Sequence, residues 1–102
     1  MTGKFQIILT AEARADLLSV TDLKTRAVIA GRVDDLEREP LKQGKPLKGP
    51  LKAYRSVRAA GQRYRIVYQV AVTAGQVVVA VIGIRQEGSK RDAYAVAEKR
   101  LK

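Results

Sequence analysis

The sequence contains no cysteine, no histidine and no tryptophan among its 102 residues. Without cysteine a secreted disulfide scaffold is excluded, and a reducing, cytosolic compartment is the expected location. Without histidine or cysteine, zinc sites of the usual kind, Ser/His/Asp triads and Cys/His dyads are impossible. These absences exclude most of the familiar ways in which a small protein builds a catalytic centre.

Long apolar runs are missing as well. Nothing approaches the roughly 20 apolar residues of a membrane span. The N-terminal stretch MTGKFQIILTAEARADLL has a short apolar run followed by acidic residues, so it predicts no signal peptide. Because the length suits one modest core, we expect a single soluble domain over residues 1–102.

Acidic residues are scarce in the second part of the chain. Residues 1–40 hold six Lys/Arg and seven Asp/Glu, whereas residues 41–102 hold fourteen Lys/Arg and three Asp/Glu, which together give the net charge of +10. Such a field concentrates polyanions, so RNA, DNA or a strongly acidic protein is the expected partner. The alternative is a solvated basic surface that only keeps the protein soluble.

The first part of the chain predicts a strand followed by two helices. KFQIIL is β-branched and apolar, and Thr10 after it can cap a helix over residues 11–20. A second helix over residues 21–39 places Ile29, Val33 and Leu36 on one face and ends before a proline. The following stretch PLKQGKPLKGPLK is predicted to be a basic loop.

Three strand-like runs follow, over residues 53–59, 63–72 and 76–85, and their short connections favour an antiparallel meander. The third run is nearly continuous Val and Ile, so it should be covered on both faces and lie centrally. A last helix over residues 88–101 would begin with Ser89 as its cap. The predicted fold class is α+β, a small twisted antiparallel sheet with helices packed mainly on one face.

Several arginines are expected at one end of this sheet. A three-residue turn over residues 73–75 would set Arg63 opposite Arg85 and Arg65 opposite Gly83, which places the three arginines on one face. A turn of two or four residues would reverse that parity. Like charges facing each other across strands favour a bound anion, although each guanidinium could instead lie flat over the sheet with its head in water.

Three further residues are candidates with a simpler alternative. Tyr94 lies at the edge of the apolar stripe of the last helix, where it could overhang the arginines or could be a rim aromatic of the core. Lys48 and Lys52 could bind the same anion or could be solvated loop charges. Because histidine and cysteine are absent, the side chains left for chemistry in the basic part of the chain are Lys, Arg and Tyr.

These residue types can assist one reaction without a metal or a cofactor, the in-line attack of an RNA 2′-hydroxyl on its own adjacent phosphate. The nucleophile belongs to the substrate, so the protein need only orient it, stabilise charge on phosphorus and move protons. Arginine suits the second task because it is planar, always charged and bidentate toward phosphate. We expect no metal and no cofactor.

The sequence resembles the RelE/ParE superfamily of toxins from bacterial toxin–antitoxin pairs. The resemblance is carried by KPLKGPLKAYR, GQRYRIVYQV, VVVAVIGIR and GSKRDAYAVAEKRL, in that order along the chain. RelE-like members are ribosome-dependent endoribonucleases that cut mRNA, and ParE-like members inhibit DNA gyrase. The resemblance therefore implies a RelE-like fold and a cytoplasmic toxin with an acidic antitoxin, the ribosome and mRNA as partners.

The resemblance to RelE-like members also implies roles for individual residues. Arg65 matches the arginine that contacts the scissile phosphate, and Arg85 matches the phosphate stabiliser or general acid. Tyr94 matches the tyrosine that stacks on the RNA and assists proton transfer, with three additional residues, roughly EGS, between it and the preceding strand.

The second-strand basic pair of the family, usually lysines, falls on Arg55 and Arg58. Arginine is a poor general base, so a lysine in that role would be Lys52 or Lys48. The predicted RNA-binding residues are listed together: Lys48, Arg55, Arg58 and Arg63. The leading hypothesis is an mRNA endoribonuclease, and the alternatives are a gyrase inhibitor without nuclease activity and a non-catalytic basic RNA-binding domain.

Overall fold

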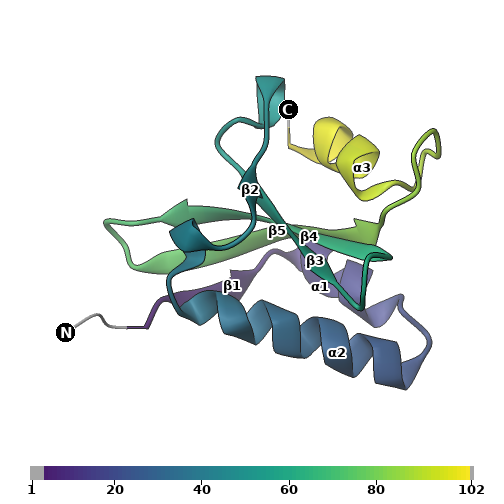
Figure 1. Ribbon diagram of the computed structural model, residues 1–102, viewed down its shortest axis with the longest axis horizontal. Coiled ribbons are helices and arrows are strands. Elements are labelled where there is room, and N and C mark those ends of the chain that lie inside the picture. Colours follow the sequence, from purple (N-terminus) through teal and green to yellow (C-terminus); the bar gives the residue numbers. More distant parts are fainter. Residues whose placement is uncertain (1–3, 102) are drawn as a thin grey trace.

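The computed structural model describes residues 4–101, so the ends of the predicted domain, residues 1–3 and 102, lie outside the described residues. The elements in chain order are β1 Gln6–Leu9, α1 Ala11–Leu18, α2 Leu23–Asp34, the 3-10 turns Asp35–Glu37 and Pro40–Lys42, β2 Lys45–Pro46, the 3-10 turn Gly49–Leu51, β3 Arg55–Ala59, β4 Tyr64–Ala71, β5 Gln76–Ile84 and α3 Ala93–Arg100. None of the helices in the described part is long and apolar enough to cross a membrane. The predicted α+β order is confirmed (Figure 1).

The sheet has five strands in the order β1-β5-β4-β3-β2. The strands β3, β4 and β5 form the predicted antiparallel meander, and β1 adds parallel to β5. β5 is an interior strand, as its continuous Val/Ile run predicts. The predicted loop over residues 40–52 contains two 3-10 turns and, between them, the unexpected two-residue edge strand β2, which pairs with β3.

Among residues 4–101, two of the three α-helices share one face of the sheet, as predicted, and the third covers the other face. α1 and α2 cover one face and α3 covers the other (Figure 1). The reason is that β4 and β5 are apolar on both sides: Ile66 packs toward the α1–α2 core, whereas Val67 and Val81 pack with Ala97 of α3. A strand that is buried on both faces needs a helix on each.

The turn between β4 and β5 is longer than predicted. Ala71 pairs with Gln76, so four residues, 72–75, make the turn in place of the predicted three. A four-residue turn should reverse the face of every earlier side chain of β4.

A β-bulge in β5 cancels that shift, because Ala80 is skipped where Val67 pairs with Val81 and Tyr68 pairs with Val79. Beyond the bulge Arg65 pairs with Gly83, as predicted. Arg85 N donates to Arg63 O at 2.7 Å, which confirms the predicted opposition of these two residues. The arginine end of the sheet therefore has the expected register, because two deviations compensate.

Local capping explains where the first helices begin and what they bury. Thr10 Oγ1 accepts a hydrogen bond of 3.0 Å from Ala13 N, which confirms the predicted cap of α1. Ile29, Val33 and Leu36 are all buried in the core shared with the sheet, as their spacing predicts.

The predicted start of the last helix is wrong. Asp92, not Ser89, is the N-cap, and its carboxylate accepts from Tyr94 N at 3.1 Å. Asp92 also forms an isolated parallel bridge with Ile84 at the end of β5. Because this bridge keeps the backbone at Asp92 extended, the helix begins at Ala93.

A polar clamp joins α1, β5 and α3 where β1 has ended. Asp16 Oδ2 accepts from Ile82 N at 3.0 Å and from Arg100 Nη1 at 2.7 Å. Arg100 Nη1 also donates to Ala80 O at 3.0 Å, and its bond to Asp16 raises the pKa of Arg100. Two side chains thus satisfy the backbone groups of β5 that β1 leaves unpaired.

Candidate nucleic-acid interface

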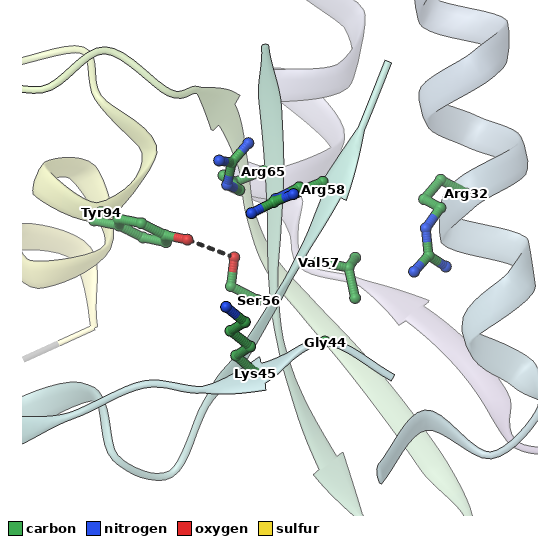
Figure 2. Close-up of a pocket in the computed structure, with 8 residues that line it drawn as sticks. All are labelled: Arg32, Gly44, Lys45, Ser56, Val57, Arg58, Arg65 and Tyr94. Atoms are coloured by element: carbon green, nitrogen blue, oxygen red, sulfur yellow. Dashed lines mark hydrogen bonds between the residues drawn. The ribbon is translucent and has the colours of Figure 1, made fainter. Parts of the chain in front are cut away.

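An open groove of about 530 Å³ lies beside β3, at the edge of the strand beyond its short pairing with β2. We call it the basic groove, and its lining residues are Arg32, Gly44, Lys45, Ser56, Val57, Arg58, Arg65 and Tyr94 (Figure 2). Four of these side chains are cationic and none is acidic. A concave surface of this composition attracts anions strongly, because the field of several cations adds up inside it.

The centre of the groove is a pair of arginines facing each other across the sheet. Arg58 of β3 and Arg65 of β4 are direct cross-strand partners. Among residues 4–101 neither forms an ion pair with a carboxylate. Two like charges on residues that are directly paired across strands repel each other unless an anion lies between them. The arrangement is therefore suited to a phosphate group.

The two guanidinium groups differ in how firmly they are held. Arg65 Nη1 donates to Gln62 O at 2.8 Å and to Tyr64 O at 3.1 Å, so one edge of its guanidinium is anchored to the chain's own backbone. Arg58 is exposed and has no such anchor in the described part of the chain. Arg65 is thus the preorganised cation of the groove.

Two hydroxyl groups form the wall of the groove opposite α2. Ser56 Oγ of β3 and Tyr94 OH of α3 share a hydrogen bond of 3.1 Å (Figure 2). Ser56 alternates with Val57, which packs in the α1–α2 core, so Ser56 and Arg58 both point toward α3. The hydroxyl pair and the arginine pair therefore share one face of the sheet.

Arg85 touches this wall from outside the groove. Its Cζ atom lies 4.7 Å from the centroid of the Tyr94 ring, a cation–π contact. Its Nη1 donates to Asp92 Oδ1 at 2.7 Å and its Nη2 donates to Glu87 Oε1 at 3.2 Å. The bond to Asp92 raises the pKa of Arg85. Arg85 is thus the one predicted catalytic arginine that is already paired with carboxylates.

Asp92 joins the end of β5, the start of α3 and Arg85. Burial disfavours its charged form, but hydrogen bonds from Arg85 and from the backbone N–H groups of Gln86 and Tyr94 outweigh burial and keep the pKa of Asp92 below its usual value. The ionised carboxylate consequently fixes the end of β5, the start of α3 and the position of Arg85 at once.

The remaining predicted residues lie outside the groove. Arg55 points to the other face, where it donates to Gln43 O at 3.1 Å. Arg63 lines a separate shallow hollow together with Arg85. Lys48 and Lys52 flank the 3-10 turn Gly49–Leu51 and are exposed on the loop, away from the groove lining.

Sequence reasoning missed Arg32, Lys45 and Ser56. The alternation of β3 carries a signal for Ser56, because it puts this residue on the same face as Arg58. No local pattern signals Arg32, which reaches the groove from α2 and donates to Gln43 Oε1 at 2.7 Å. Lys45 was hidden in a stretch predicted to be an irregular loop.

Lys45 reaches the groove because Gly44 allows β2 to approach β3 closely. Gly44 has φ of +67°, and a Cβ atom there would lie 2.5 Å from Ser56 O. Only glycine adopts this conformation at no steric cost. The strand pair then sets Lys45 opposite Ser56.

The groove can bind and polarise a phosphate group without help from a carboxylate. Residues 4–101 contain no cluster of three or more His, Cys, Asp or Glu side chains that could hold a metal ion. Arginine forks stabilise added charge on phosphorus, and the hydroxyl pair offers proton donors beside them. The site therefore has the elements needed for phosphate recognition, and for phosphoryl chemistry whose nucleophile comes from the substrate.

Comparison with known proteins identifies the family. Residues 7–89 match the family described as ParE toxin of type II toxin-antitoxin system, parDE. The chain belongs to the RelE/ParE superfamily. No curated protein sequence matches this toxin closely enough to add to that assignment.

Solved structures agree with the fold of this RelE/ParE toxin. The RelBE2 complex from Mycobacterium tuberculosis contains a chain that is 29% identical, with a TM-score of 0.74 over 83% of this chain and 95% of that chain. A mutant of Escherichia coli RelE in the free state is 20% identical, with a TM-score of 0.73 over 97% and 99%. The ParDE system of Pseudomonas aeruginosa gives 18% identity and a TM-score of 0.66 over 79% and 96%. Both branches of the superfamily therefore share this fold.

Proposed function

We propose that this toxin is a metal-independent, ribosome-dependent mRNA endoribonuclease of the RelE type. The observation that carries the proposal is the cross-strand pair of Arg58 and Arg65 in a groove lined by four cations and no carboxylate. Two facing arginines without a carboxylate partner in the described part of the chain are suited to an anion that lies between them. Phosphate in an RNA backbone satisfies both of them.

The proposed reaction is attack of the 2′-hydroxyl on the adjacent phosphorus. The new O2′–P bond forms while the P–O5′ bond breaks, which yields a 2′,3′-cyclic phosphate and a 5′-hydroxyl. Arg65, anchored by its own backbone contacts, stabilises the charge that accumulates on the non-bridging oxygens. Arg58 supports it from the opposite strand.

Tyr94 orients the RNA in the proposed reaction. Its ring can stack on a base while its hydroxyl remains fixed to Ser56, because Arg85 holds the ring from outside the groove. Arg85 thereby acts on the reaction through Tyr94. Stacking on an aromatic ring is worth about 1–3 kcal/mol per base in single-stranded RNA recognition.

The ribosome is the proposed platform for cleavage, which places the toxin in the cytoplasm. The exposed cations outside the groove, Lys48, Lys52 and Arg63, are available to bind ribosomal or messenger RNA phosphates. Such contacts position the protein and depend strongly on salt.

Two alternatives remain distinct from this proposal. The matching family description names a ParE toxin, and the resemblance to ParE-like members implies inhibition of DNA gyrase without nuclease activity. The basic composition alone would fit a non-catalytic RNA-binding domain.

Mapping transcript ends after expression of the toxin separates all three functions. Cuts in phase with codons inside translated regions support the endoribonuclease, and intact messages with gyrase-linked DNA breaks support the gyrase inhibitor. Intact messages and intact DNA support the RNA-binding domain.

The proposed protein partner is an acidic antitoxin, as the RelBE and ParDE complexes suggest. A net charge of +10 should speed its association by long-range attraction, and the association rate should fall steeply as salt rises. The measurement is stopped-flow association of the toxin with the protein that co-purifies from its native operon. An association rate that does not depend on salt would contradict the electrostatic part of this proposal.

A further inference from the structure

The proposed cleavage needs a group that removes the proton from the 2′-hydroxyl. A guanidinium group cannot do this in a protein, because it does not give up its own proton. The basic residues of β3 are both arginines, Arg55 and Arg58, so that strand offers no proton acceptor. The acceptor must come from another element.

Among the described lysines, only Lys45 lines the basic groove. It lies on the edge strand β2, directly opposite Ser56, whose hydroxyl is bonded to Tyr94. Figure 2 shows the Lys45 side chain rising beside Ser56 toward the arginines. Its amine is therefore on the same face as the proposed phosphate-binding pair.

The backbone around Lys45 is well constrained for so short a strand. Pro46 pairs with Arg55, and Leu47 N donates to Tyr54 O at 3.0 Å just beyond it. Within residues 4–101 the Lys45 amine forms no ion pair with a carboxylate. The backbone is fixed, and the amine remains available for a substrate.

We propose that Lys45 is the catalytic proton acceptor of this toxin, delivered to the groove by β2 and not by β3. The inference rests on the proposed endoribonuclease function. In its neutral form the Lys45 amine takes the 2′-hydroxyl proton as the O2′–P bond forms. The departing 5′-oxygen takes a proton from water. The Lys45 ammonium then gives its proton to solvent, which restores the neutral amine.

Two simpler roles for Lys45 make a different prediction. A lysine on an edge strand can protect that edge from aggregation, and a lysine in a basic groove can bind phosphate as a point charge. Arginine would serve either role. Only proton transfer requires a side chain that can become neutral.

The test compares Lys45→Arg and Lys45→Ala with the wild-type toxin in single-turnover cleavage of mRNA on purified ribosomes. Both variants should cleave about 100- to 10,000-fold more slowly, the usual contribution of a general base. Lys45→Arg should bind the ribosome as tightly as the wild type, because its charge is unchanged. Lys42→Arg, in the same loop but outside the groove lining, is the matched control and should cleave normally.

A second variant measures proton transfer directly. The native chain has no cysteine, so Lys45→Cys can be alkylated with 2-bromoethylamine at that position alone. The alkylated side chain is nearly as long as that of lysine and again ends in an amine. The ammonium form of this amine is a stronger acid than the ammonium form of lysine. Cleavage should return, with its pH–rate profile displaced toward lower pH.

The outcomes are distinguishable. Wild-type cleavage together with a Lys45→Arg rate close to wild type would overturn the assignment of Lys45 and leave the endoribonuclease proposal standing. Restored cleavage by the alkylated Lys45→Cys protein with an unshifted pH profile would also overturn it. An absence of codon-phased cleavage by the wild-type toxin would overturn the proposed function itself, and the Lys45 assignment with it.

Discussion

Replacing Arg65 with alanine should slow cleavage about 100- to 1,000-fold, which corresponds to about 2.7–4 kcal/mol of activation free energy. The reason is that Arg65 is held in place before substrate arrives. Its Nη1 atom is bonded to Gln62 O and Tyr64 O, and the rest of the guanidinium faces the groove. A charge that needs no reorganisation at the moment of reaction gives the largest stabilisation of the transition state.

The effect on folding should be much smaller. The two lost hydrogen bonds end on backbone carbonyl groups, that of Gln62 exposed in the turn before β4 and that of Tyr64 at the start of β4, so Arg65→Ala should lower the free energy of unfolding by about 1 kcal/mol. Arg65→Lys should cleave at an intermediate rate, since it keeps the charge but loses the planar fork.

The assay is single-turnover cleavage of an mRNA on ribosomes, with urea unfolding measured on the same preparations. Arg14→Ala is the matched control, because Arg14 is exposed on α1, on the opposite face of the sheet, and its loss changes net charge equally. A rate for Arg65→Ala equal to that of Arg14→Ala would refute the reasoning about the groove.

Three further predictions concern the framework that positions the groove. Asp16→Ala should lower the free energy of unfolding by about 2–3 kcal/mol in urea denaturation, because a backbone N–H of β5 and the partly buried Arg100 lose their acceptor. Asp92→Asn should be less stable than wild type at neutral pH. This difference should close in acid, below about pH 4, because the lowered pKa of Asp92 stabilises the fold only while the carboxylate is ionised. Gly44→Ala should displace β2 from Ser56 and slow cleavage more than it reduces ribosome binding, measured by single-turnover kinetics and sedimentation.

Each of these predictions has a clear contrary result. Equal stability of Asp16→Ala and wild type would show that the clamp contributes nothing measurable. A stability difference for Asp92→Asn that persists unchanged at low pH would contradict an ionised carboxylate at the start of α3. Normal cleavage by Gly44→Ala would show that the position of β2 does not matter to the reaction.

The helices and strands could be predicted because they depend on residues that are close in sequence. Thr10 caps the helix that follows it, and Ile29 and Val33 recur at helical spacing. The last cap was missed because Ser89 and Asp92 are both good capping residues. What selected Asp92 was its bridge to the end of β5, a contact from outside the local stretch.

The pairing of the arginines was predicted correctly, but for an incomplete reason. Arg65 lies opposite Gly83 because a bulge in β5, where Ala80 has no partner in β4, offsets a turn that is one residue longer than predicted. A bulge inserts an additional residue without changing the composition of the strand, so alternation alone does not reveal it. The arginine end of the sheet depends on both deviations together.

The side-chain chemistry of this toxin can be read from its amino-acid sequence alone: many cations, few acids, and no histidine or cysteine. The sequence also brought Arg58, Arg65 and Tyr94 into consideration. The packing of the elements, by contrast, brings Arg32 and Lys45 beside them and pairs Arg85 with a carboxylate. This could not be read from the sequence because the groove forms where α2, β2, the meander and α3 meet. The identity of a side chain is local, whereas its distance from another element is decided by how the whole core packs.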